Sequence, residues 1–197
     1  MISEIMAAGI GGIDAYPVCV EVDISTGLPG ISMVGLLGSE VREAKERVQV
    51  ALKNAGYHIP PMKITINLAP ANIRKEGSSY DLAIAVGILE ALGHFSAEAT
   101  KGILFAGELG LDGEIRAVRG ILPMVQRASQ EGMKECIVPF ENTKEGAVVP
   151  LAKVRGAKNI CQVVTFLQEK SKERENILPV VCVDLEALLK QGKAAAG

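Results

Sequence analysis

The most constraining feature of this chain of 197 residues is a segment, Leu82 to Leu92, in which nearly every residue is apolar. A helix that is apolar all round has to be covered by protein on every side. We therefore predict a buried helix here, closed by Gly93 and capped at its start by Ser78 or Ser79. The fold must then supply a sheet and further helices to enclose it.

Alternation and helical spacing predict those other elements. Residues 13–25 alternate between apolar and polar and indicate a half-buried strand, which we expect to form a hairpin with 31–34 across a Gly-Leu-Pro-Gly turn. Asp112-Gly113 predicts a second hairpin turn. Further strands are predicted at 63–69, 103–106, 136–138 and 153–157, and helices at 39–55, 121–131 and 159–168, the last capped by Asn159.

This order predicts an α+β fold, a mixed α/β sandwich with helices packed on a mixed sheet. The domain is expected to cover 1–168. The stretch 169–197 begins with a charged run, EKSKERE, and ends in a short Leu-rich helix. We interpret it as a linker toward a further module, and the chain as a fragment of a longer protein.

Composition and spacing argue against several classes of function. The net charge is −2 and aromatic residues make up 4%, so neither general attraction to polyanions nor a base-stacking platform is indicated. Gly192-Lys193 lacks the rest of a phosphate-binding loop. His58 and His94 are isolated, and the four cysteines lie far apart in apolar stretches, which favours buried thiols over metal ligands. We expect neither a metal nor a bound cofactor in this chain.

The same features predict a location. The longest apolar run has eight residues, whereas a membrane span needs ~20. Residues 1–10 contain no basic side chain, which argues against a secretory signal. We therefore predict a soluble, cytoplasmic protein with no membrane contact.

The strongest candidate for chemistry is the polar loop that precedes the apolar helix, Lys75-Glu76-Gly77-Ser78-Ser79-Tyr80-Asp81. A serine at the start of a helix can stabilise a developing anion, but as a nucleophile it needs a base within hydrogen-bond reach. The residues alone favour helix capping for Ser78 and Ser79.

Long stretches of the chain resemble a known family. These are GIDAYPVCVEVDISTGLPGISMVGL (12–36), VREAKERVQVALKNAGYHIPPMKITINLAPANIRKEGSSYDLAIAVGIL (41–89) and GELGLDGEIRAVRGILPMVQRASQEGMKECIVPFEN (107–142). They are similar to the start of the YifB/ComM proteins, which are Mg-chelatase-like AAA ATPases. The resemblance implies the fold of the Lon protease domain, also called ribosomal S5 domain 2-like.

The resemblance also implies which residues occupy the catalytic positions of the Lon protease domain. Lon uses a Ser–Lys dyad, and its serine motif, K-D-G-P-S-A-G, corresponds to residues 75–81, with Ser79 at the nucleophile position. Its lysine motif, G-G-L-K-E-K, corresponds to 119–124 and places Leu122 at the base position. Because leucine cannot accept a proton, we predict a Lon-like fold without peptidase chemistry and no catalytic residue.

Three functions follow as expectations. The first is an assembly or substrate-positioning module for an ATPase portion of the same protein. The resemblance implies that this protein uses ATP and Mg²⁺, forms hexamers and remodels DNA by branch migration in natural transformation. The second is direct contact with DNA or a partner through Arg74, Lys75, Arg116 and Arg119, against the alternative of a solvated surface of mixed charge. The third is a serine peptidase in which Lys75 or Lys134 assists Ser79.

Overall fold

The computed structural model describes residues 2–195, and its centre is a seven-stranded sheet in the order β3-β4-β2-β1-β5-β8-β9. The β1–β2 and β2–β4 pairs are antiparallel, and the other four pairs are parallel. The strands are β1 (Ile2–Gly11), β2 (Asp14–Ser25), β3 (Gly30–Val34), β4 (Lys63–Ala69), β5 (Ile103–Phe105), β8 (Glu135–Pro139) and β9 (Lys153–Ala157). A separate small hairpin joins β6 (Glu108–Leu109) to β7 (Ile115–Arg116).

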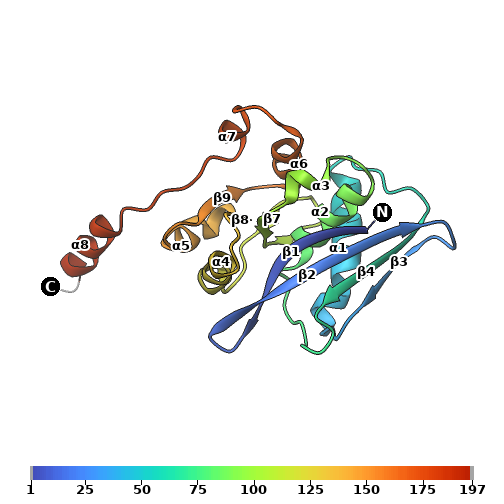
Figure 1. Ribbon diagram of the computed structural model, residues 1–197, viewed down its shortest axis with the longest axis horizontal. Coiled ribbons are helices and arrows are strands. Elements are labelled where there is room, and N and C mark those ends of the chain that lie inside the picture. Colours follow the sequence, from blue (N-terminus) through green and yellow to red (C-terminus); the bar gives the residue numbers. More distant parts are fainter. Residues whose placement is uncertain (1, 196–197) are drawn as a thin grey trace.

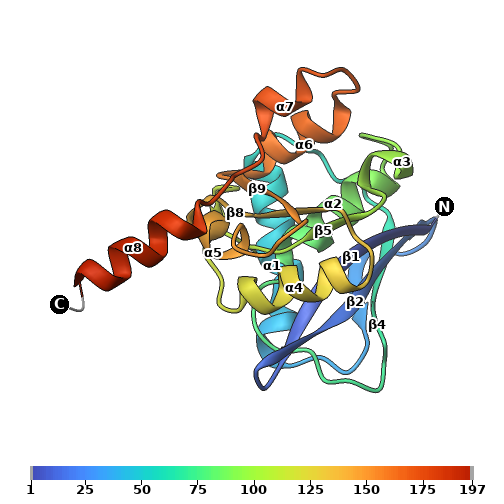
Figure 2. The same ribbon diagram turned by 60° about the vertical axis from the view of Figure 1, so that its left-hand side comes forward.

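Helices cover both faces of the sheet (Figures 1 and 2). One core contains α1 (Ser39–Asn54), α2 (Asp81–Ala91) and α6 (Ile160–Gln168), and a second contains α4 (Ile121–Gln130). The mixed α/β prediction is therefore confirmed. Shorter helices are α3 (Ala97–Thr100), the 3-10 turn η1 (Phe140–Asn142), α5 (Thr143–Gly146) and α7 (Arg174–Ile177), and α8 (Leu185–Ala195) follows them.

The apolar helix α2 is enclosed as predicted. Its residues Asp81 to Glu90 are all buried, because it lies between the sheet on one side and α1 on the other. The approach to the sheet is close at Gly87, where a Cβ atom would lie 2.7 Å from Val22 Cγ2. Glycine at this position therefore lets the helix sit directly on β2.

One strand prediction was wrong, and one strand was missed. Ile31–Val34 does not form a hairpin with 13–25; β3 pairs in parallel with β4, and α1 carries the chain between them. Both edges of β2 are already occupied by β1 and β4. The other error is β1, for which no strand was predicted. Its buried positions include Ser3, Ala7 and Ala8, which are too small or polar to show a clear apolar alternation.

Two side-chain predictions also need correction. Neither serine caps α2, because Tyr80 occupies the N-cap position without a side-chain cap bond. The cysteines are not uniformly buried: Cys136 is buried, whereas Cys161 and Cys182 are exposed. By contrast, the Asn159 side chain does cap α6, accepting a hydrogen bond from Gln162 N at 2.9 Å.

The first part of the predicted linker packs against the edge of the sheet. The fully buried Arg155 guanidinium on β9 donates to Glu175 at 2.9 Å and to the Leu178 carbonyl at 2.6 Å. Val181 N donates to the Val154 carbonyl at 2.9 Å. These contacts cover the outer edge of β9. Beyond them, α8 projects away from the body of the molecule (Figures 1 and 2).

Candidate functional site

A cleft of about 450 Å³ opens beside the loop that precedes α2. One wall is formed by residues 76–79 and the other by residues 117–120, which connect β7 to α4. Ile10 from β1 and Met124 from α4 contribute apolar surface. The fold therefore brings together two segments that the sequence analysis had singled out separately.

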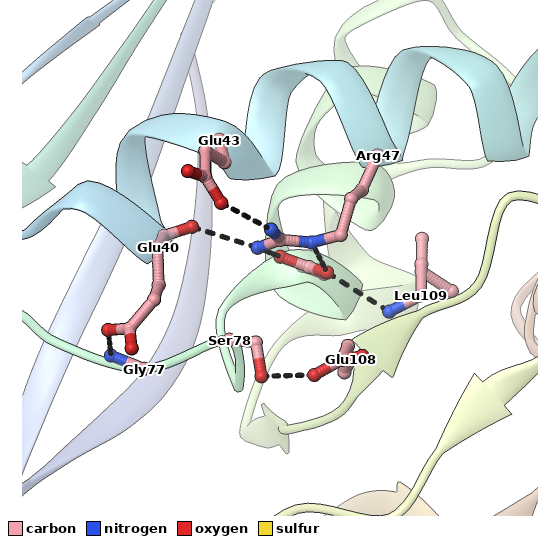
Figure 3. Close-up of polar contacts among 8 residues, drawn as sticks. Glu40, Glu43, Arg47, Gly77, Ser78, Glu108 and Leu109 are labelled. Atoms are coloured by element: carbon pink, nitrogen blue, oxygen red, sulfur yellow. Dashed lines mark hydrogen bonds and ion pairs between the residues drawn. The ribbon is translucent and has the colours of Figure 1, made fainter.

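A network of part-buried and buried hydrogen bonds lies where the loop wall of this cleft meets α2 (Figure 3). Arg47 on α1 donates to both carboxylate oxygens of Asp81, at 2.8 and 3.0 Å, and Asp81 also accepts from Leu109 N at 3.1 Å. Asp81 is completely buried. Burial raises the pKa of its carboxyl group, and the hydrogen bonds from Arg47 oppose that rise. Through Arg47, Asp81 and Leu109, these bonds join α1, α2 and β6.

Two further bonds hold the loop itself (Figure 3). Gly77 N donates to Glu40 Oε2 at 3.2 Å, and the Ser78 hydroxyl donates to the Glu108 carboxylate. Ser78 is thus a structural residue that ties the loop to β6. Ser79 is 8% exposed and lines the cleft.

The two positions of the Lon-like dyad are not equivalent in the structure. Ser79 lines the cleft, whereas Leu122 is absent from its lining and borders a separate surface hollow with Val148 and Val149. Leu122 is 40% exposed, and its main-chain N donates to Glu145 Oε1 at 3.0 Å. Within the described chain, no lysine or histidine lines the Ser79 cleft.

The predicted contact residues lie in different environments. Arg116 and Arg119 are exposed, and Arg119 lines the cleft. Arg74 is exposed but forms an ion pair with Glu76 at 2.9 Å. Lys75 corrects the prediction: it is fully buried, its ammonium group donates to the Pro70 carbonyl, and burial lowers its pKa. It therefore supports the loop from inside and presents no charge to a ligand.

The other candidate residues form no recognisable centre. His58 is exposed, and His94 stacks edge-on against Tyr57 with ring centroids 5.5 Å apart. Residues 2–195 contain no cluster of three or more His, Cys, Asp or Glu side chains suited to a metal ion. In the same range, no helix has the length and apolar character needed to cross a bilayer.

Sequence reasoning missed two features of the site. The Arg47–Asp81 pair joins residues 34 positions apart, and no local pattern connects them. The Asn142 side chain exchanges two hydrogen bonds with the main chain of Val118, each 3.0 Å long. The one sequence signal for the Arg47–Asp81 pair was an acidic residue, Asp81, at the start of an otherwise apolar helix.

The fold and the cleft define a mixed α/β domain with a serine-lined cleft in which, among the described residues, no lysine or histidine takes part. Comparison with known proteins identifies the family to which the chain belongs. The family model described as subunit ChlI of Mg-chelatase matches residues 20–142, and the chain belongs to this family.

Individual relatives agree with that assignment. The chain is 40% identical to competence protein ComM of Haemophilus influenzae over 161 residues, covering 82% of this chain and 31% of the relative. It is 37% identical to the uncharacterized protein YifB of Escherichia coli over 191 residues, covering 94% of this chain and 38% of that protein. The resemblance to the YifB and ComM proteins is thus confirmed, and the chain spans about a third of their length.

A more distant similarity supports the fold. Lon protease 2 of Bacillus subtilis is 28% identical over 127 residues, which cover 60% of this chain and 22% of the protease.

Proposed function

We propose that this chain is a non-catalytic domain that binds and positions a substrate or partner for the rest of a Mg-chelatase-like protein. The observation that carries the proposal is the composition of the Ser79 cleft. A serine nucleophile needs a neighbouring group that accepts its proton, and lysine or histidine supplies this near neutral pH. The charged side chains of the cleft are Arg119, whose guanidinium is a hydrogen-bond donor only, and Glu76, which is exposed and paired with Arg74.

The activity of the whole protein is part of the same proposal. The chain matches 31% of ComM and 38% of YifB, and the first of these relatives is named a competence protein. We propose that the whole protein binds ATP and Mg²⁺ outside this domain, assembles as a hexamer and remodels DNA, as the resemblance to Mg-chelatase-like AAA ATPases implies. In that protein, the partner of this domain is its own ATPase portion.

A hydrolysis assay tests the central part of the proposal. The purified chain and the Ser79→Ala variant are incubated with fluorescently quenched casein and with short fluorogenic peptides. We expect both proteins to release fluorescence at the rate of buffer alone. Hydrolysis by the parent chain that disappears in Ser79→Ala would overturn the proposal.

Direct contact with DNA is a second candidate, favoured by one observation. Arg116 at the end of β7 and Arg119 in the segment that follows it are both exposed, and neither takes part in the ion pairs found among residues 2–195. Fluorescence anisotropy with a labelled duplex at two salt concentrations tests it, since each phosphate contact contributes about −0.9 to the salt slope. DNA contact requires that Arg116→Ala and Arg119→Ala flatten this slope while Lys101→Ala, an exposed control elsewhere, does not.

A further inference from the structure

The segment 117–120, which forms the second wall of the cleft, resembles an edge strand whose hydrogen-bonding groups are already paired on one side. The side-chain amide of Asn142 donates to the Val118 carbonyl and accepts from Val118 N, as the main chain of a neighbouring strand would. On either side, Ala117 and Arg119 are exposed and line the cleft. The hydrogen bonds within residues 2–195 leave the main-chain N–H and C=O groups of both residues free.

The opposite wall adds a polar side chain without a partner. Ser79 is more than nine-tenths buried and lines the cleft, while its neighbour Ser78 is bonded to Glu108. Within the described chain, the Ser79 hydroxyl takes part in no hydrogen bond. Because Ser79 lines the cleft, a ligand there can supply an acceptor or a donor to this hydroxyl.

The floor of the cleft is apolar. Met124 is buried and Ile10 is 40% exposed, and Ile10 packs so closely on Gly120 that a Cβ there would lie 2.8 Å from its side chain. The volume, about 450 Å³, is in the range of pockets that bind small ligands or anchoring side chains. Polar main-chain groups above an apolar floor match the chemistry of a peptide.

Charge separates a peptide from a nucleic acid as the occupant. The charged residues of the lining are Glu76 and Arg119, which have opposite signs. A cleft that is neutral overall offers no electrostatic gain to a polyphosphate chain. Binding of an uncharged, extended main chain does not depend on a charged cleft.

We propose that the cleft binds an extended segment of another polypeptide without cleaving it. The segment forms main-chain hydrogen bonds with Ala117 and Arg119, as in strand addition, a carbonyl of the segment accepts from Ser79, and one apolar side chain rests on Ile10 and Met124. This inference rests on the proposed function, since it names the class of partner that the non-catalytic cleft takes.

The test is a titration of the isotopically labelled chain of 197 residues, followed by two-dimensional amide NMR. The probe is a mixture of acetylated and amidated hexapeptides with a fixed central leucine, and a DNA duplex is titrated separately. We expect saturable peptide-induced shifts at Ser79, Ala117, Arg119 and Gly120, and peptides that remain intact by mass spectrometry. Shifts confined to other surfaces, no shifts at millimolar peptide, or shifts at this cleft from DNA alone would overturn the inference.

Variants sharpen the result. Ile10→Glu places a charge on the floor and is expected to weaken peptide binding at least tenfold, while Leu111→Glu, a control at another exposed apolar residue, leaves it unchanged. Ser79→Ala removes one neutral hydrogen bond and is expected to weaken binding about threefold to tenfold. Equal effects of the two glutamate variants would contradict the assigned position. Cleaved peptides would instead refute the non-catalytic function.

Discussion

Replacement of Asp81 by alanine is expected to cause a large loss of stability. The substitution leaves the Arg47 guanidinium without its carboxylate and the Leu109 N–H without an acceptor. Removing one partner of a buried ion pair costs ~3–5 kcal/mol, and Arg47 is 21% exposed in its side chain, so the lower end applies. An unsatisfied buried N–H adds ~1 kcal/mol or more. We therefore expect the free energy of unfolding to fall by about 4 kcal/mol.

Thermal unfolding followed by circular dichroism measures this loss. For a domain of this size, 1 kcal/mol corresponds to ~2–4 °C, so the Tm of Asp81→Ala should fall by roughly 8–16 °C. A double-mutant cycle with Arg47→Met isolates the pair, and we expect a coupling energy above ~1.5 kcal/mol. The exposed pair Arg74–Glu76 is the matched control, with an expected coupling of ~0–1 kcal/mol. Equal couplings in the two cycles would refute the reasoning.

Two further predictions concern packing and pH. Gly87→Ala should lower the free energy of unfolding by ~1–3 kcal/mol in denaturant titrations, because the added Cβ would meet Val22. The control Gly192→Ala on α8 has open space around the added Cβ and should not destabilise the chain. Equal effects of the two variants would contradict the close packing of α2. Hydrogen bonds from Arg155 hold the pKa of Glu175 below its ordinary value of 4.5. The pair therefore stabilises the fold fully above pH 4.5, and this stabilisation is lost as the pH falls through the lowered pKa of Glu175 in the folded chain. Glu175→Gln should thus lower the Tm at pH 7 and have a smaller effect at pH 3, and an effect that grows on acidification would show that the sign is wrong.

The elements that sequence predicted well are those with a strong local signal. The alternation of β2, the apolar character of α2 and the Asn159 cap each depend on neighbouring residues, and all three are present in the structure. The partner of β3 could not be found in this way, because the choice between β2 and β4 is made by the α1 crossover and by β1 occupying the other edge.

In the candidate site too, features with a local sequence signal were predicted, and features that depend on the folded chain were not. The polar loop with Ser79 was predicted from its local sequence and does line the cleft, whereas the role of Leu122 as a replaced base rests on the resemblance to Lon and stays a prediction. The sequence did not reveal that Lys75 points inward, since a lysine in a polar loop is usually solvated, nor that Asn142 would fill one side of Val118. The Asn142–Val118 contact spans 24 residues, and the burial of Lys75 depends on the packing around its loop, so both require the folded chain.

The measurement that tests the central claim most directly is covalent labelling of Ser79 by a fluorophosphonate, read out by intact-mass and peptide mass spectrometry. The probe reacts with serines whose hydroxyl is activated by a neighbouring base. The absence of lysine and histidine from the cleft lining predicts no labelling of Ser79 in the folded chain. Stoichiometric labelling that is specific to Ser79 and lost on unfolding would contradict a non-catalytic domain.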